Sequence, residues 1–362
     1  SSSHAGGSTA TTVAPSPAPY AQSGPYSVGF TTLHLAGGRR VVVWYPAAAS
    51  STAGHAQESI DVAGFLSPAL QAKVPKDDRI LYQANAYQDA PAASAPAGGF
   101  PLVVFSHGFA GFAEQSVTLT THLAGWGFVV AAPEHVERSL DGLLGTAAQG
   151  VPKQTDRQVL SATATLLVKT SSAAGLLHGL VDANQIVAAG HSAGASAALD
   201  FASDPRVKAW ISYSVSNAGG PNEPAAAIPD KPGMVMLGTT DGIIPPAQSR
   251  AVYVSMRAPK TLVEIAKAGH LVFSDICLIG ASKGGIVAIA KAIKLPIPAS
   301  LLRLGSDGCT KDHPPVAQAF PAIDQLSVAF FRNVLGIDPQ PVGLSTDAVR
   351  GLGADVTVTR AP

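Results

Sequence analysis

Short apolar runs recur along the chain, and after the first pair they alternate with stretches of helical character. Such runs predict buried strands, here at residues 27–35, 40–45, 102–106, 127–132, 186–189, 207–214, 234–237 and 262–265. Helices are predicted at residues 115–126, 156–168, 193–202, 247–256 and 323–335. Strands that alternate with helices indicate the fold class α/β, with a doubly wound, mostly parallel sheet of about eight strands flanked by helices.

Three long intervals interrupt this alternation, at residues 47–99, 138–154 and 272–315. We expect them to be insertions in one domain of residues 25–336. Residues 1–24 are rich in Ser, Thr, Ala, Gly and Pro and resemble the flexible leader left when a signal peptide is removed; an artificial leader would have the same composition. In the C-terminal tail, residues 337–362, the alternation at 356–359 indicates either a short edge strand or no regular structure.

A candidate nucleophile lies where one predicted strand meets the next helix. Gly190, Ser192 and Gly194 form a G-x-S-x-G pattern directly after the apolar run 186–189. In this setting a tight turn requires the glycines, and the serine is held at a strained backbone angle with its hydroxyl above the sheet. A second copy of the pattern surrounds Ser282, but no later strand presents an acid and a histidine to it, so we expect Ser282 to be a structural turn.

The stretch at residues 101–111 gives Ser192 a candidate oxyanion hole. Four apolar residues are followed by Ser-His-Gly-Phe, and Gly-rich strand ends can also be plain turns. In enzymes with a nucleophile elbow, the loop after an upstream strand supplies one backbone N–H, and the residue after the nucleophile supplies the other. These donors are expected to be Phe109 and Ala193. Phe109 is also expected in the wall of the substrate pocket, together with His191.

The acid and the base are predicted at the ends of two later strands. Asp241 follows the apolar run 234–237, whereas Asp230 precedes that run in a sequence typical of a surface turn. His270 follows the strand predicted at 262–265 and a Gly-containing turn. In this order Ser192 would attack, His270 would take and return its proton, and Asp241 would fix the imidazole tautomer and stabilise the imidazolium.

The motifs at residues 42–46, 101–111, 127–135 and 190–194 resemble the platelet-activating-factor acetylhydrolase and dienelactone-hydrolase-like branch of the α/β-hydrolases. Bacterial cutinase-like polyester hydrolases share this layout. The resemblance covers about residues 25–336 and implies that this region is a catalytic domain. In the acetylhydrolases the acid follows the strand after the elbow, where this chain has neither Asp nor Glu at residues 209–217; its acid is expected at the cutinase and dienelactone-hydrolase position, Asp241.

Composition narrows the function classes. The net charge is zero with 13% charged residues, which disfavours a nucleic-acid partner and recruitment to anionic membranes. The longest apolar region, residues 271–302, is interrupted by charged residues, so no integral membrane segment is predicted. Neither C-x-x-C nor H-E-x-x-H occurs, so we expect no metal and no cofactor.

Two cysteines, Cys277 and Cys309, bracket a segment rich in Gly, Pro and Ala. We expect a disulfide that tethers the insertion after His270; two buried free thiols are the alternative. A disulfide implies an oxidising compartment and, with the leader, a secreted protein.

The sequence therefore predicts a secreted serine carboxylic-ester hydrolase that acts through an acyl-enzyme on short- or medium-chain acyl esters, with polyesters and lipid esters as further substrates. It is expected to be a monomer whose partner is the ester substrate. An acyltransferase with the same triad and a non-catalytic binding protein with this fold are the alternatives.

Overall fold

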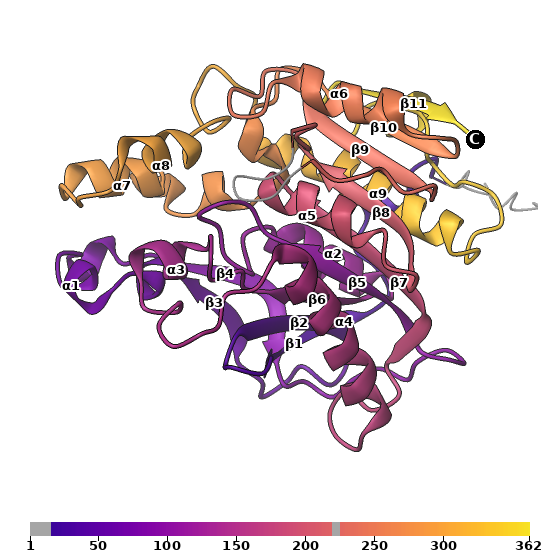
Figure 1. The fold of residues 1–362 in the computed structure, drawn as a ribbon, viewed down its shortest axis with the longest axis horizontal. Helices are drawn as coiled ribbons and strands as arrows, with labels where there is room; N and C mark the ends of the chain where they lie inside the picture. Colours follow the sequence, from indigo (N-terminus) through magenta and orange to yellow (C-terminus); the bar gives the residue numbers. More distant parts are fainter. Residues whose placement is uncertain (1–15, 219–224) are drawn as a thin grey trace, which may run out of the picture.

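The computed structural model describes residues 16–218 and 225–362, and these build a single eleven-stranded sheet covered by helices on both faces (Figure 1). Its order is β11-β10-β9-β8-β7-β5-β6-β2-β1-β4-β3. The strands are β1 (Ser27–His34), β2 (Arg40–Ala47), β3 (Gln57–Asp61), β4 (Leu81–Gln88), β5 (Phe100–Ser106), β6 (Val129–Pro133), β7 (Val181–His191), β8 (Val207–Tyr213), β9 (Gly233–Gly238), β10 (Lys260–Ile265) and β11 (Val356–Ala361). The segment from β6 to β10 is parallel, as the alternation with helices predicts.

The two faces of the sheet hold separate apolar cores. Helices α2 (Val117–Gly125) and α9 (Phe320–Val334) cover one face, and α4 (Asp156–Ser172), α5 (Ala193–Phe201) and α6 (Pro246–Ser255) cover the other. Neighbouring residues of β5 serve opposite cores: Val103 packs towards α2 and α9, whereas Val104 packs towards α4 and α5. This double burial explains why the central strands are continuously apolar in sequence.

All eight predicted strands are present, and three more extend the sheet. β3 and β4 come from the insertion 47–99 and form an antiparallel pair at one edge, with β4 joined to β1 only at Gly29 and Phe30. β11 pairs antiparallel with β10 at the other edge, which resolves the alternation in the tail as an edge strand. Edge strands carry a weaker apolar signal because one side of them faces solvent.

The three insertions gather beyond one end of the sheet. Residues 47–99 also contain η2 (Val62–Phe65), α1 (Pro68–Gln71) and η3 (Lys76–Asp78), and residues 138–154 contain α3 (Leu140–Leu144). Residues 272–315 contain η5 (Ile276–Leu278), η6 (Ala281–Lys283), α7 (Ile286–Ala292) and α8 (Ala299–Leu304). In Figure 1, α7 and α8 project as an orange arm on the same side as the purple and magenta arm of α1 and α3. Ser282 lies exposed in η6, a structural turn as expected.

The remaining short elements are η1 (Pro19–Ala21), η4 (His270–Phe273), η7 (Val316–Gln318) and α10 (Thr346–Val349). η1 belongs to the segment that composition assigned to the leader, of which residues 1–15 lie outside the described residues. Within η1, Tyr20 is buried and its amide donates to Gln325 Oε1 at 2.7 Å, so this part packs on the domain. None of the helices in the described residues is long and apolar enough to cross a membrane.

Candidate active site

Ser192 lies between β7 and α5 in the conformation that the elbow pattern predicts. Its backbone has φ 61° and ψ −119°, a strained angle for a residue with a side chain. The flanking glycines are required by close approach rather than by their own dihedrals. A Cβ on Gly190 would lie 2.0 Å from the carbonyl oxygen of Gly194, and a Cβ on Gly194 would lie 2.0 Å from that of Ser106. The elbow therefore fits only if both positions lack a side chain.

The structure brings Ser192, His270 and Asp241 together in one hydrogen-bonded chain. His270 Nε2 lies 2.9 Å from Ser192 Oγ, and His270 Nδ1 lies 2.9 Å from Asp241 Oδ2. Asp241 follows β9 and His270 begins η4 after β10, so all three come from the same end of the parallel strands β7, β9 and β10, where open α/β sheets bind ligands. The geometry is that of a nucleophile, its base and the group that orients the base.

Asp241 is held as a carboxylate by four donors. Its Oδ1 accepts the amides of Ile243 and Ile244 at 2.9 and 2.8 Å, and its Oδ2 accepts His270 Nδ1–H and the hydroxyl of Ser214. Burial by itself would raise the pKa of Asp241, but these hydrogen bonds and His270 outweigh it, and the pKa is lowered from its ordinary value. The acid is therefore ionised and fixed in orientation at neutral pH.

Ser214, which the sequence analysis did not single out, completes this cluster. It follows the end of β8, is buried, and takes a left-handed backbone conformation with φ 60°. Its hydroxyl donates to Asp241 Oδ2 and lies 3.3 Å from His270 Nδ1. The resemblance to the acetylhydrolases, which carry their acid after this strand, is the one signal that points to this position.

The amides of Phe109 and Ala193, the expected oxyanion donors, make no hydrogen bond to the described residues. Ala193 is the first residue of α5, so its N–H has no partner within the helix, and the positive end of the helix dipole lies there. Gly108 brings the loop against the nucleophile, since a Cβ on it would lie 3.4 Å from Ser192 Cβ. The two donors thus remain available beside the serine.

Gln115 links the oxyanion loop to the base, and the sequence analysis missed it as well. Its Oε1 accepts the amide of Gly108 at 2.9 Å, so its Nε2 faces His191 Nδ1 at 3.0 Å and donates to it. His191 Nε2–H then donates to the carbonyl oxygen of His270 at 2.9 Å. Burial and nearby His270 lower the pKa of His191 to about 3, so the ring is neutral, as this chain of donors requires.

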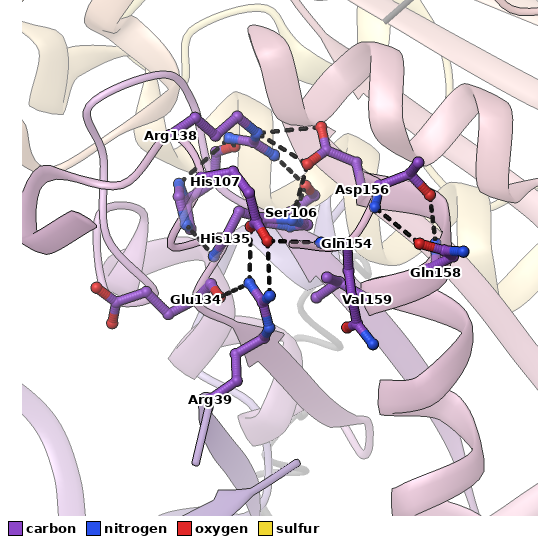
Figure 2. A network of polar contacts seen from close by, with 12 residues as sticks. Arg39, Ser106, His107, Glu134, His135, Arg138, Gln154, Asp156, Gln158 and Val159 are labelled. Carbon is purple, nitrogen blue, oxygen red and sulfur yellow. Dashed lines mark hydrogen bonds and ion pairs between the residues drawn. The ribbon is translucent and has the colours of Figure 1, made fainter. Parts of the chain in front are cut away.

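A second buried network supports the oxyanion loop from behind (Figure 2). Arg138 donates to the carbonyl oxygen of His107 and to Ser106 Oγ, while its Nε lies 3.0 Å from Asp156 Oδ2. The amide of Ala110 donates to the carbonyl oxygen of Arg138 at 2.7 Å. Because Ala110 has φ 57°, this contact holds the loop in a turn that it would not adopt alone.

Within this network Ser106 contacts His135, and His135 contacts Asp156, so the three side chains are connected in the same way as a Ser-His-Asp catalytic triad. Ser106 Oγ lies 2.8 Å from His135 Nε2, and His135 Nδ1 lies 3.0 Å from Asp156 Oδ1. Ser106 and His135 are both fully buried, so no substrate reaches them. Burial, reinforced by Arg138, lowers the pKa values of His107 and His135, which are therefore neutral. This cluster is structural.

The arm of α7 and α8 is fastened next to the base. Cys277 and Cys309 form the predicted disulfide, with their Cα atoms 5.1 Å apart. Asp307 Oδ1 accepts the amide of His270 at 2.6 Å and that of Gly242 at 3.3 Å. One carboxylate of the insertion thus holds both loops that carry the base and the acid, a role that only the folded arm reveals.

A pocket opens from Ser192 between the two arms. It is lined near the serine by Phe109 and His191, as expected, and farther out by residues from the ranges 62–80, 140–144 and 276–305. No cluster of His, Cys, Asp or Glu in the part of the chain that the structure describes could hold a metal ion. The site therefore offers the chemistry of a serine nucleophile beside an apolar hollow.

Comparison with known proteins agrees with this fold. The sequence model of the family described as platelet-activating factor acetylhydrolase, isoform II, matches residues 19–149, which include the oxyanion loop but not Ser192. The chain is similar to the structure of a ferulic acid esterase from Streptomyces cinnamoneus, with 22% identity, a TM-score of 0.60, and coverage of 93% of this chain and 97% of that one. No curated protein matches the chain. The structural similarity confirms the α/β-hydrolase fold, and the family match supports the carboxylic ester hydrolase class.

Proposed function

We propose that this α/β-hydrolase is a serine carboxylic-ester hydrolase that works through a covalent acyl-enzyme on Ser192. The observation that carries the proposal is the unbroken chain from Ser192 Oγ through His270 to Asp241, at the foot of a pocket and beside two amides with no acceptor. The family likeness over residues 19–149 points to the same class of reaction.

In the first half-reaction Ser192 Oγ attacks the ester carbonyl carbon, and its proton passes to His270 Nε2. Asp241 stabilises the resulting imidazolium through Nδ1–H. The carbonyl oxygen becomes an oxyanion that accepts the amides of Phe109 and Ala193, each worth about 2.7–4 kcal/mol of barrier in enzymes of this type. His270 then gives its proton to the leaving alkoxide oxygen as the ester C–O bond breaks.

In the second half-reaction water takes the place of the alcohol. His270 removes a proton from the water as its oxygen attacks the acyl carbon, the same two amides hold the oxyanion, and the proton returns to Ser192 Oγ as the acid product leaves. Every group that these steps require comes from one chain, so we propose that the protein acts as a monomer. If an alcohol acceptor outcompetes water at this step, the same site performs acyl transfer.

We also propose that the protein acts outside the reducing cytosol. The disulfide between Cys277 and Cys309 closes the arm beside His270, and such bridges persist in oxidising compartments. Fractionation of the producing cells, with the protein found in the medium or the periplasm, would support export.

The test is hydrolysis of p-nitrophenyl esters by the unmodified protein, Ser192→Ala and Ser282→Ala. Ser192→Ala should lose at least about 10⁴-fold in kcat, because the triad acts as a unit. Ser282→Ala should retain full activity, because Ser282 is exposed in a turn. A fluorophosphonate should label Ser192 alone. An inactive parent protein, or full activity in Ser192→Ala, would contradict the proposal and favour a binding protein or another site.

A further inference from the structure

The hollow between the two arms is unusual in being made almost entirely of aliphatic side chains. Besides glycines, Asp78 and the groups around Ser192, its walls are Val, Leu, Ile and Ala, almost all from the insertions, and its two phenylalanines are Phe109 and Phe112. Together with the open solvent at its mouth, the space is about 1180 Å³. In Figure 1 the arm of α7 and α8 faces the arm of α1 and α3 across this region.

The arm of α7 and α8 presents an apolar face that the described residues bury only in part. Ile286, Ile289 and Ile293 recur at helical spacing in and just after α7, and all three line the pocket. Leu301 of α8 also lines the pocket. Neither α7 nor α8 contains a fully buried residue. An apolar face that is continuous with a reactive serine is suited to an apolar part of the substrate.

Charge narrows the class of substrate further. Outside the cluster around Ser192, Asp78 is the one ionisable residue among the described residues of the lining, and it forms an ion pair with Lys283 at 2.8 Å. No Lys or Arg of the described lining points to recognition of a carboxylate or phosphate. Among the described residues, the outer walls contain no aromatic ring that would stack on an aromatic acyl group.

A disulfide and several hydrogen bonds fasten the insertions that form the pocket. The disulfide closes the base of the arm, and Asp307 fastens it to the amides of His270 and Gly242. On the facing side, the amide of Ser67 donates to the carbonyl oxygen of Leu144 at 2.8 Å and joins the first two insertions. A preformed pocket loses less conformational entropy when it binds a chain.

Building on the proposed function, we infer that the arms bind an uncharged aliphatic chain of the ester, longer than the short acyl groups that the triad alone would accept. The chain extends from the carbonyl carbon at Ser192 along the apolar face of α7. It belongs to the acyl group or to the alcohol, and two substrate series distinguish these sources.

The first series consists of p-nitrophenyl esters from acetate to palmitate, and the second of alkyl acetates from ethyl to dodecyl, all below their micelle concentrations. Each methylene buried between the arms should raise kcat/KM by about fourfold, in the series whose chain occupies the pocket. Methyl ferulate serves as the aromatic comparison and should be hydrolysed more slowly than the corresponding octanoate.

Two matched variants locate the chain. Ala290 lines the pocket, whereas Ala292 lies exposed outside it on the same helix. Ala290→Trp should reduce kcat/KM for the octanoyl or octyl ester at least about tenfold and change the acetyl ester of the shortest alcohol less than about twofold, which also shows that the variant is folded. Ala292→Trp should change neither.

The inference is overturned if kcat/KM is flat or falls with chain length in both series, if Ala290→Trp affects short and long esters equally, or if ferulate is preferred. These outcomes leave the proposed function intact, because they presuppose an ester hydrolysed through Ser192. Failure of the proposed function is different: no ester of either series is hydrolysed, or Ser192→Ala remains active.

Discussion

Replacing Ser214 by Ala tests whether the orientation of Asp241 limits the reaction. The change removes the hydroxyl that donates to Asp241 Oδ2, the same oxygen that receives His270 Nδ1–H. The backbone angle of φ 60° is as strained for Ala as for Ser, so the variant isolates the hydroxyl. Ser214→Gly also removes the hydroxyl but relieves that strain.

The structure sets the size of the effect. A hydrogen bond to an ionised group contributes about 1.5–3 kcal/mol, and Asp241 keeps three other donors, from Ile243, Ile244 and His270. We therefore take the lower end, about 1.5 kcal/mol, which corresponds to a roughly tenfold loss in kcat/KM. The hydroxyl also lowers the pKa of Asp241, so without it activity should fail at a higher pH on the acid side.

The assay is the pH profile of kcat/KM on one p-nitrophenyl ester, paired with the free energy of unfolding in denaturant. Ser214→Ala and Ser214→Gly should lose activity equally, while the Gly variant unfolds less readily than the Ala variant. Ser327→Ala is the control, because Ser327 is also buried and its hydroxyl lies 2.8 Å from Tyr213 Oη, away from the triad. Activity of Ser214→Ala within twofold of the parent, with an unshifted profile, would refute the reasoning.

Three further changes probe the surroundings of the triad. Gly194→Ala should yield no folded, active protein, because its Cβ would meet the carbonyl oxygen of Ser106 at 2.0 Å; soluble expression with intact circular dichroism would contradict this. Gln115→Leu should lower kcat about tenfold or more and destabilise the fold by about 1–3 kcal/mol, because it leaves the Gly108 amide and His191 Nδ1 without partners; an unchanged kcat would exclude this positioning role. Because burial lowers the pKa of His191 to about 3, well below that of the unfolded chain, the unfolded state binds more protons between pH 6.5 and 3. The free energy of unfolding should therefore fall as pH decreases through this range, by up to about 1.4 kcal/mol per pH unit for this group, and the fall should be smaller in His191→Gln.

The elbow and the order of the site were predictable because their signals are local. β7, Ser192 and α5 follow one another without interruption, and Asp241 and His270 each follow their own strand. Chain order then reports proximity, because parallel strands end at the same edge of the sheet. The edge strands were harder to predict from the sequence. In β4 the apolar and polar residues alternate weakly, and β4 pairs with β1 at only two residues, so its position depends on the assembled sheet.

The residues that the sequence did not reveal act through distant partners. β8 lies between β7 and β9, which places Ser214 between the nucleophile and the acid, and nothing in its neighbouring residues encodes that position. Asp307 lies 37 residues after His270, whose amide it accepts. Gln115 precedes α2, and its importance depends on which loop its amide reaches. Such contacts join residues that are far apart in the sequence. They depend on the topology of the whole fold, which local sequence patterns do not specify.

The disulfide at the base of the arm of α7 and α8 also affects how this protein can evolve. Cys277 and Cys309 are separated by 32 positions, and their disulfide is a covalent junction that closes the residues between them into a ring. Substitutions or insertions near the tip of the arm therefore alter the walls of the pocket without moving the junction, and Asp307 keeps its hold on His270 near that junction. We expect new substrate preferences to arise by changes at the tip of this ring, while Asp307 and the reacting groups stay as they are.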